Sequence, residues 1–395
     1  MKTLLTKIEG AVTAPRGFRA AAAAAGIKPG GKLDMALIVS DVPATAAATF
    51  TTNQVKAAPV KVSMQHIQHG KACAIVVNSG NANACTGAIG LIHAEAMAAA
   101  VARRIGCPDR AVLVCSTGRI GVIMPIVKIE AGIKKLLGSL SATGGPSAAR
   151  GIMTTDTFPK QIAVRVKTGR RVIRIGAIAK GAGMIEPHMA TMLCFITTDA
   201  AIPRAALQKA LRTAVNQSFN RITVDGNMST NDTVICLANG LAGEFPLPAF
   251  QQALNYVCLE LAKMIVLDGE GVSKFVTVHV TGAANDREAE LAARAVANSI
   301  LVKCCWCGGD ANWGRIMDAL GYSRARVDED SVDIAYNGVL AVRNGMAAHV
   351  SLARLKKIVA GPAFTVDINL KIGRGRCTIY TCDLTEKYVT LNKGE

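Results

Sequence analysis

Short apolar runs separated by glycine, proline and polar residues occupy roughly the first 60 residues of the chain. Examples are AVTAPRGFRA, GIKPGGKLDMALIVSD and AAATFTTNQV. Short apolar runs bounded by turn-forming residues are typical of strands. We therefore expect this part of the chain to consist of strands and loops.

Two later stretches join an apolar run to a loop of small residues. CAIVVNSGNANAC covers residues 73–85 and AVLVCSTGRIG covers residues 111–121, with a helix expected between them over 92–105. A strand that runs into a glycine-rich loop is a common place for backbone N–H groups to meet a ligand. Both loops are therefore candidate binding segments.

Helical periodicity appears in the middle of the chain. It predicts helices over 201–219, over 250–271 with an end at Gly269, and over 285–304. In the first of these, Pro203 suits the first turn and Asp199 could cap the helix.

Acidic residues and the closing strands complete this pattern. Asp286, Glu288 and Glu290 are expected in the first turn of the third helix, where the helix dipole favours negative charge.

Strands return over 332–342 and 364–392. Strands, then helices, then strands predict an α/β (α+β) fold in which layered sheets are covered by helices.

Composition places the chain among compact globular proteins. Of its 395 residues, 50% are hydrophobic and only 4% aromatic, so Ala, Val, Ile, Leu and Met must build the core. The length suits two or three domains, or one large α/β unit with a smaller partner. No apolar run reaches the roughly 20 residues of a membrane helix, and MKTLLTKIEG lacks the apolar core of a secretory signal. We expect a cytoplasmic protein that does not enter a membrane.

The twelve cysteines are scattered except in CCWC at 304–307. Cys304 and Cys307 form a C-x-x-C, which raises the possibility of zinc or redox chemistry. A structural zinc site needs four ligands, and no second pair follows. Buried free thiols and no bound metal are the favoured interpretation.

The formal net charge of +17 is unusual. Together with the run TGRRVIRI at 168–175, it could indicate nucleic-acid binding. However, the basic residues are spread along the chain, and the aromatics that stack on bases are scarce. We favour a basic surface that attracts small anionic molecules.

A threonine at the centre of the chain could carry chemistry. It is Thr191 in KGAGMIEPHMATMLCFITTDA, residues 180–200. A hydroxyl needs a base to act as a nucleophile, and cleavage before Thr191 would free an α-amine with a pKa of about 8. Ala190 is small and Gly181 and Gly183 give a flexible loop, as such cleavage requires. A threonine that merely begins a strand is the alternative, and these residues alone leave both open.

This central stretch resembles the cleavage segment of the ornithine acetyltransferase family, also called bifunctional glutamate N-acetyltransferases. Further resemblances follow in the order of the family's own motifs, from about residue 14 to the C-terminus. They are APRGFRA, ATFTTNQVKAAPV, VNSGNANACTG, STGRIG, MTTDT, STNDTV, LDGEGVSKF and GGDANWGRI.

The resemblance implies self-cleavage between Ala190 and Thr191. The products would be an α chain of residues 1–190 and a β chain of residues 191–395, expected to assemble as an α2β2 heterotetramer. Thr191 would become the N-terminal nucleophile of a self-cleaving fold.

Other positions carry over one by one. Thr117 and Gly118 in STGRIG correspond to the oxyanion hole, through a hydroxyl and a backbone N–H. The substrate-binding positions implied by the resemblance are Thr154, Lys180, Thr191, Glu270 and Asn392. A cationic lysine suits the substrate carboxylate, and a glutamate suits its ammonium group.

Some residues depart from the family pattern. Glu186 and His188 stand where relatives commonly carry a small residue and Asn, and His188 could be read as a general base although the family works without one there. Asn227 and Met228 replace a usual Asp-Thr, which puts local turn contacts in doubt. The chain ends three residues after Asn392, short of a terminal Ser or Thr that relatives place on substrate.

The implied reaction moves an acetyl group from N-acetylornithine to Thr191 and then to glutamate, within arginine biosynthesis and without metal or organic cofactor. Whether acetyl-CoA also serves as a donor stays open. An aminopeptidase or amidase of similar fold would share Thr191 but transfer the acyl group to water. A basic nucleic-acid-binding protein with an inactive site is the third possibility, against which the intact motifs argue.

Overall fold

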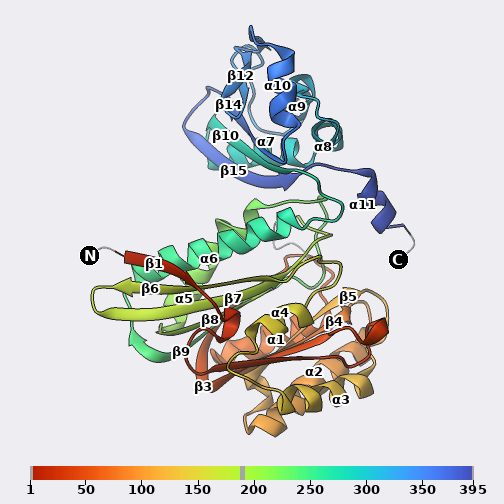
Figure 1. The fold of residues 1–395 in the computed structure, drawn as a ribbon, viewed down its shortest axis with the longest axis vertical. Coiled ribbons are helices and arrows are strands. Elements are labelled where there is room, and N and C mark those ends of the chain that lie inside the picture. Colours follow the sequence, from red (N-terminus) through yellow and green to blue (C-terminus); the bar gives the residue numbers. More distant parts are fainter. Residues whose placement is uncertain (1–2, 187–191, 394–395) are drawn as a thin grey trace. The chain divides into compact units, whose positions relative to one another are not determined.

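The computed structural model describes residues 3–186 and 192–393. These residues form two compact units (Figure 1). The first contains residues 1–220 and 227–265, and the second contains residues 221–226 and 266–395. Each unit has its own sheet and its own helices.

The first unit is built on a nine-stranded mixed sheet in the order β1-β6-β7-β8-β9-β3-β4-β5, with β2 paired to β3. The pairs β8–β9 and β4–β5 are parallel, and the other pairs are antiparallel. The strands are β1 (Thr3–Ile8), β2 (Phe18–Ala23), β3 (Met35–Phe50), β4 (Lys71–Asn81), β5 (Val112–Arg119), β6 (Lys160–Thr168), β7 (Arg171–Lys180), β8 (Leu193–Ala201) and β9 (Thr233–Glu244).

The long strand β3 joins the two halves of this sheet. Residues 35–40 pair with β2, whereas residues 45–50 pair with β9. The register with β4 shifts between Val39 and Ala44, and Pro43 lies in this interval. Because proline has no N–H to donate, an irregular interval is where a strand tolerates it. The chain can therefore turn from one half of the sheet into the other without a break.

Side chains alternate between two core clusters along these strands, as the period of two requires. In β4, Ala74 and Val76 pack in a cluster with the helices α1–α3, whereas Ile75 and Val77 pack in a second cluster with residues of β7–β9. The predicted layering of helices on sheets is therefore confirmed for this unit. Its helices are α1 (Ala58–His66), α2 (Gly87–Ile105), α3 (Ile126–Gly138), α4 (Gly145–Gly151), α5 (Arg204–Asn216) and α6 (Leu247–Leu267).

The second unit holds a six-stranded sheet in the order β13-β12-β11-β14-β10-β15, in which only β10–β14 is parallel. Helix α7 buries Ala289, Ala292, Ala293 and Val296 against it, which is the spacing of one helix face. The elements are β10 (Phe275–Ala283), α7 (Asp286–Asn298), α8 (Ile300–Cys307), α9 (Trp313–Gly321), β11 (Asp333–Tyr336), β12 (Val339–Arg343), β13 (Met346–Ala347), α10 (Leu352–Val359), β14 (Ala363–Asn369), β15 (Gly375–Cys382) and α11 (Glu386–Leu391).

The helices predicted over 92–105, 201–219 and 250–271 are confirmed, with shifted ends. Helix α2 begins five residues earlier than expected, at Gly87, because the loop before it is stabilised by side-chain hydrogen bonds that do not show in the periodicity. Helix α6 ends at Leu267, two residues before Gly269.

The segment predicted as one helix over 285–304 is instead two helices, α7 and α8. Ser299 separates them, with an extended φ/ψ of −64°/113°, and its side chain accepts a hydrogen bond from Val302 N as the cap of α8. A serine side chain that competes for backbone donors favours such a cap over a helix interior. Glu290 lies beyond the first turn of α7 and pairs with Arg294 and Arg221.

Two other expectations are wrong. Asp199 does not cap α5; it is buried in β8 and accepts hydrogen bonds from the backbone N–H groups of Arg16 and Arg174. The last part of the segment predicted as strand over 364–392 is the helix α11. Its Thr385 hydroxyl donates to the Gly271 carbonyl at 2.6 Å, so a contact far along the chain anchors its start.

The predicted division into residues 1–190 and 191–395 differs from the division into compact units. Strand β8, the first of the second predicted chain, lies between β7 and β9 within the large sheet. Both predicted chains therefore contribute strands to the first unit.

Candidate active site

The predicted cleavage point lies between two neighbouring strands of the large sheet. Lys180, the last residue of β7, pairs with Leu193, the first of β8. Ala190, Thr191 and His188 fall between them and lie outside the described residues. The side chains around the ends of β7 and β8 therefore define the candidate site.

Thr117 and Lys180 meet at this place. Both are 3% exposed, and the Lys180 ammonium donates to the Thr117 hydroxyl with an Nζ–Oγ1 distance of 3.4 Å. Since the hydroxyl oxygen accepts this bond, the hydroxyl proton can be donated elsewhere. The structure thus brings together a predicted oxyanion-hole residue and a predicted substrate-binding residue from β5 and β7.

Gly118 follows Thr117 in β5, opposite Gly80 in β4. Its φ is +131°, and a Cβ at this position would lie 2.3 Å from the Gly80 carbonyl carbon. Only glycine allows the two strands to approach this closely with that φ. The close approach holds the Thr117–Gly118 peptide, the second predicted donor, against β4.

A network of buried amides and hydroxyls supports the same segment. Asn231 donates through Nδ2 to the Ser116 carbonyl at 2.8 Å and to the Ala82 carbonyl at 2.7 Å. The Ser116 hydroxyl donates to Asn78 Oδ1 at 2.6 Å. These bonds join the motifs VNSGNANACTG, STGRIG and STNDTV. They also give each buried polar group the hydrogen-bond partner that it needs away from water. They fix Ser116, the residue that precedes Thr117.

Asp156 in the MTTDT motif is a buried carboxylate with partners on three segments. It forms a 2.6 Å ion pair with Lys160, in which both side chains are fully buried. It also accepts from the backbone N–H groups of Gly181 and Thr154, each at 2.8 Å. The predicted residue Thr154 is therefore held beside the end of β7.

Positive charges surround this carboxylate. Burial opposes ionisation of Asp156, but Lys180 and Lys160 outweigh it and hold the pKa of Asp156 well below its ordinary value. Lys28 donates to the carbonyls of Met153 and Leu33. Burial, with Lys180 as a further contribution, lowers the pKa of Lys28 to about 8 although Asp34 opposes this shift. Lys160 balances Asp156, and Asp34 lies beside Lys28. Lys180 therefore leaves a local excess of positive charge, which suits an anionic ligand.

Asp232 lies on the β8 side of the cleavage segment. Its Oδ1 accepts from Met192 N at 2.8 Å. Its Oδ2 is buried and accepts no hydrogen bond from the part of the chain that the structure describes. Burial raises the pKa of Asp232 well above its ordinary value, although the Met192 N–H and Lys180 act in the opposite direction. The residue following Thr191 is thus anchored to the residue that precedes β9.

The other two predicted substrate residues lie in the second unit. Asn392 donates through Nδ2 to Glu270 Oε2 at 2.8 Å and to the Tyr388 carbonyl at 3.0 Å. Two residues that are 122 positions apart are therefore neighbours, as a shared binding role requires. The structure places Glu270 and Asn392 together, and Thr117, Gly118, Thr154 and Lys180 together in the first unit.

Sequence reasoning missed Asp156, Lys160, Lys28 and Asp232. Asp156 and Asp232 stand inside recognised motifs, MTTDT and STNDTV, and an acidic residue in a small-residue loop was the available signal. Nothing in the local sequence marked Lys28 or Lys160, because their burial depends on strands that come together from distant parts of the chain.

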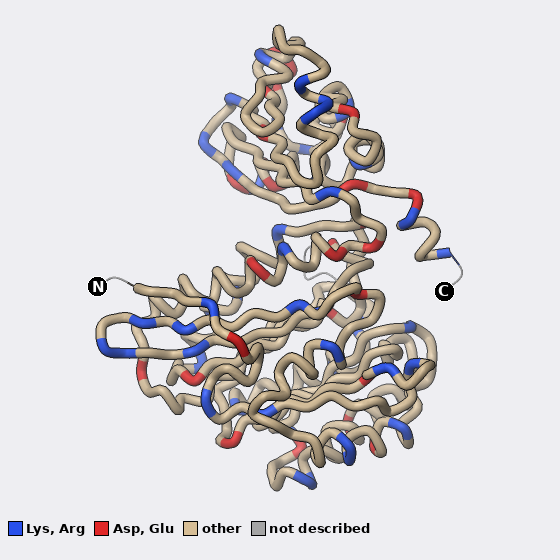
Figure 2. The backbone as a smooth tube through the Cα atoms, in the orientation of Figure 1, with Lys and Arg blue, Asp and Glu red and all other residues tan. Residues whose placement is uncertain are grey.

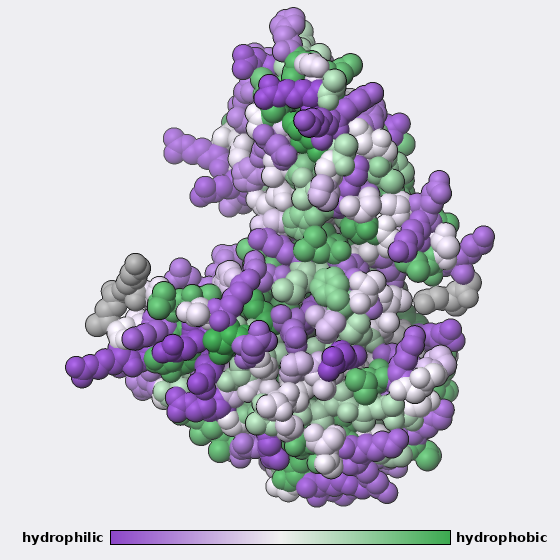
Figure 3. Space-filling view, in the orientation of Figure 1, coloured by the Kyte–Doolittle hydropathy of each residue, from purple (hydrophilic) through white to green (hydrophobic). Residues whose placement is uncertain are grey.

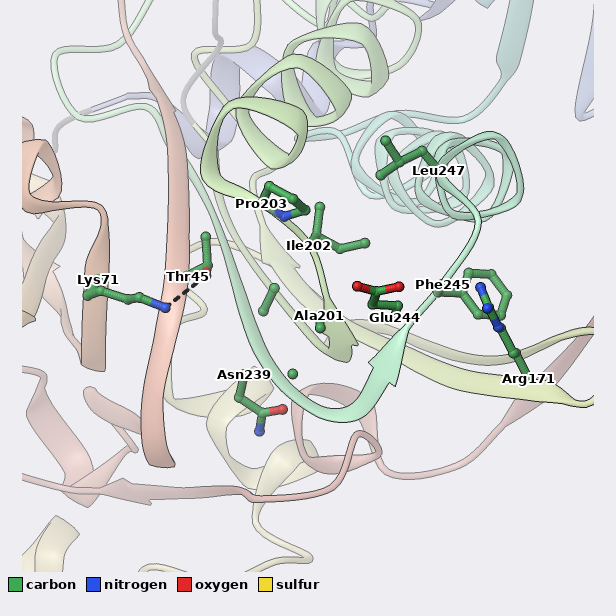
Figure 4. A pocket seen from close by; sticks show the side chains of 12 residues that line it. Thr45, Lys71, Arg171, Ala201, Ile202, Pro203, Asn239, Glu244, Phe245 and Leu247 are labelled. Atoms are coloured by element: carbon green, nitrogen blue, oxygen red, sulfur yellow. Dashed lines mark hydrogen bonds between the residues drawn. The ribbon is translucent and has the colours of Figure 1, made fainter.

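A separate cavity of about 500 Å³ lies at the opposite end of β8 and β9 (Figure 4). Lys71, Arg171, Glu244, Ile202 and Phe245 are among its lining residues. The nine residues of β8 put about 25 Å between the two ends of the strand. This cavity is therefore distinct from the candidate site, since Thr117, Gly118 and Lys180 do not line it.

The distribution of charge over the surface is relevant to the alternative interpretation as a nucleic-acid-binding protein. Lys and Arg are distributed over both units, with a group at the turn of the β6–β7 hairpin (Figure 2). On the face seen in Figure 3, long hydrophilic side chains project from each unit. Within residues 3–186 and 192–393, no helix could cross a membrane, and no group of three His, Cys, Asp or Glu could hold a metal ion.

The profile of the ArgJ family matches residues 19–394. The chain belongs to the ArgJ family. This ArgJ chain is 49% identical over 385 residues to the arginine biosynthesis bifunctional protein ArgJ of Geobacter sulfurreducens, covering 95% of the chain and 98% of that relative. It is 48% identical to the protein of the same name from Symbiobacterium thermophilum, with 98% of each covered.

Among solved structures, this ArgJ chain is similar to ornithine acetyltransferase complexed with ornithine from Mycobacterium tuberculosis. The identity is 44% and the TM-score 0.44, with 47% of this chain and 98% of that chain covered. The match to the family model over residues 19–394 confirms the family expected from the motifs. The roles of individual residues stay predictions.

Proposed function

We propose that the protein is a self-processing acetyltransferase that moves an acetyl group from N-acetylornithine to glutamate. Family membership supports this class of reaction. The observation that carries the proposal is the buried contact between Thr117 of β5 and Lys180, the last residue of the strand that precedes Ala190-Thr191. A hydroxyl suited to an oxyanion hole and a cation suited to a carboxylate are thus within hydrogen-bond distance of each other.

In the first half-reaction, the neutral α-amine of Thr191 takes the proton of its own hydroxyl. The oxygen attacks the acetyl carbon of N-acetylornithine, and the carbonyl oxygen becomes negative. The Thr117 hydroxyl and the Gly118 N–H donate to that oxygen, which lowers the barrier because they are already oriented. The C–N bond then breaks, and the departing amine receives the proton. Ornithine is released, and the acetyl group remains on Thr191 as an ester.

In the second half-reaction, the α-amine of glutamate attacks the acetyl ester. The same two donors stabilise the second tetrahedral intermediate, and the hydroxyl of Thr191 recovers its proton as N-acetylglutamate forms. Donor and acceptor share an α-carboxylate, which suits the positive charge at Lys180. Glu270, held by Asn392, suits the ammonium group of a substrate.

Self-cleavage creates the nucleophile. The Thr191 hydroxyl attacks the Ala190 carbonyl carbon, and the Ala190–Thr191 C–N bond breaks, which frees the α-amine and leaves an ester. Hydrolysis of this ester releases the Ala190 carboxylate and regenerates the Thr191 hydroxyl. The cleaved chains would stay associated because β8 pairs with β7 and β9 pairs with β3, so strands of the two chains alternate within one sheet. We expect an α2β2 assembly in the cytoplasm that needs no cofactor, and the use of acetyl-CoA as a second donor is open to assay.

The deciding experiment follows both events in one preparation. Purified protein should run as two chains, with the chain of residues 191–395 beginning Thr-Met-Leu-Cys, and Thr191→Ala should remain one inactive chain. Acetylornithine should be consumed rapidly only when glutamate is present. Equal consumption with and without glutamate would instead indicate an amidase, and an active uncleaved Thr191→Ala protein would rule out the mechanism.

A further inference from the structure

One buried carboxylate connects the residues expected to bind the substrate carboxylate. Asp156 uses Oδ1 for the Lys160 ammonium and for Gly181 N, and Oδ2 for Thr154 N and, at 3.5 Å, for the Thr154 hydroxyl. Gly181 is the residue after Lys180, so the bond to its N–H fixes the peptide that carries Lys180 into the site. Thr154 is fixed by the same side chain.

Lys160 occupies a different position. It lies at the start of β6, opposite Ala179 of β7, and its ammonium is 5.0 Å from the centre of the Phe158 ring. Its side chain is fully buried against Asp156. Lys160 therefore serves to neutralise the carboxylate in the interior, whereas Lys180 reaches the Thr117 hydroxyl.

We propose that Asp156 is a positioning residue that builds the subsite for the α-carboxylate of the substrate, by holding Lys180, through the Gly181 peptide, and Thr154 in one arrangement. This inference rests on the proposed function. A purely structural Asp156 would only balance the buried charge of Lys160, and the two roles predict different behaviour in variants.

The experiment measures binding instead of turnover, so it does not depend on self-cleavage. Calorimetry compares ornithine with 1,4-diaminobutane, which is ornithine without its carboxylate. The ratio of the two dissociation constants reports the carboxylate subsite alone. A general loss of stability would not change this ratio in the folded protein, because both ligands need the same fold.

Asp156→Asn should lower the preference for ornithine by about 10- to 100-fold, the effect of losing hydrogen bonds to a charged group. Lys160→Met is the matched control, since it breaks the same ion pair from the other side. It should lower the midpoint of urea unfolding but keep the ornithine preference within about threefold of the wild type, because the bonds to Gly181 and Thr154 remain.

The double variant Asp156→Asn with Lys160→Met separates the two roles. It removes both buried charges, so its unfolding midpoint should recover toward that of the wild type while the ornithine preference stays low. Recovery of the preference in the double variant would overturn the positioning role, as would an unchanged preference in a folded Asp156→Asn protein. A wild type that binds neither ligand and transfers no acetyl group would refute the proposed function itself.

Discussion

Replacing Gly118 with alanine tests whether the close approach of β5 to β4 shapes the oxyanion hole. The added Cβ would lie 2.3 Å from the Gly80 carbonyl carbon, 2.5 Å from Asn81 N and 2.7 Å from Gly80 Cα. All three are backbone atoms, so no side chain can rotate away to relieve the contact. The strands must separate, or the Thr117–Gly118 peptide must turn.

Two costs add in this variant. A non-glycine residue held at a φ of +131° costs about 1–3 kcal/mol. Forcing a methyl group into a filled space costs about 1–3 kcal/mol more. We therefore expect Gly118→Ala to lower the free energy of unfolding by about 2–6 kcal/mol. A displaced Gly118 N–H should also lower kcat by about 100- to 1,000-fold, as loss of an oxyanion donor does.

Gly121→Ala is the matched control in the same motif. Its φ is +79°, and a Cβ there would meet nothing within 4 Å, so only the backbone term of about 1 kcal/mol remains. Its N–H bond to the Ala84 carbonyl is retained. Urea unfolding measures the stability of both variants, and acetyl transfer from N-acetylornithine to glutamate measures kcat. Equal losses in the two variants, or a Gly118→Ala protein with wild-type kcat, would refute the reasoning.

Three other outcomes are expected. Thr117→Ala should lower kcat with little change in KM, because the Thr117 hydroxyl acts on charge that develops only in the transition state. Lys180→Ala should also raise KM, because Lys180 acts on a substrate carboxylate that is charged throughout the reaction. Identical changes in kcat and KM for the two variants would show these roles to be wrong. The pKa of Lys28, about 8, lies below its ordinary value of 10.5, so this side chain is charged below about pH 8 and neutral above it. Ornithine affinity should therefore fall as the pH rises through 8, and an unchanged profile in Lys28→Met would contradict this. The two half-reactions predict parallel double-reciprocal lines when acetylornithine is varied at fixed glutamate concentrations, together with an acetylated 191–395 chain. Intersecting lines without an acetylated chain would indicate direct transfer from donor to acceptor.

The stability of the Asp156 ion pair also has a defined pH range. The pKa of Asp156 in the folded protein is below its ordinary value of 3.8. Its contribution to folding is therefore complete above that value and is lost only as the pH falls below it. We expect Asp156→Asn to remove the same stability at pH 6 as at pH 8, measured by urea unfolding; a large difference between these two values would contradict the assignment.

The family could be identified, and several site residues could be predicted, from the sequence alone, because motifs depend on local order along the chain. Long motifs in register identify the family, and the apolar spacing in α5 and α7 follows from 3.6 residues per turn. Thr117, Gly118 and Lys180 stand within such motifs. A buried contact between Thr117 and Lys180 agrees with their predicted place in one site.

Only the tertiary structure decided which polar groups meet. The position of Asp199 just before α5 favours a helix cap, yet the fold places its carboxylate against the backbone N–H groups of Arg16 and Arg174. These hydrogen bonds stabilise the fold because buried N–H groups would otherwise have no partner. Asp156 and Lys160 lie four positions apart, but their burial comes from β6 and β7 pairing and from Gly181 being close. Sequence periodicity reports which face of an element is apolar, whereas the partner of a buried charge depends on how distant segments come together.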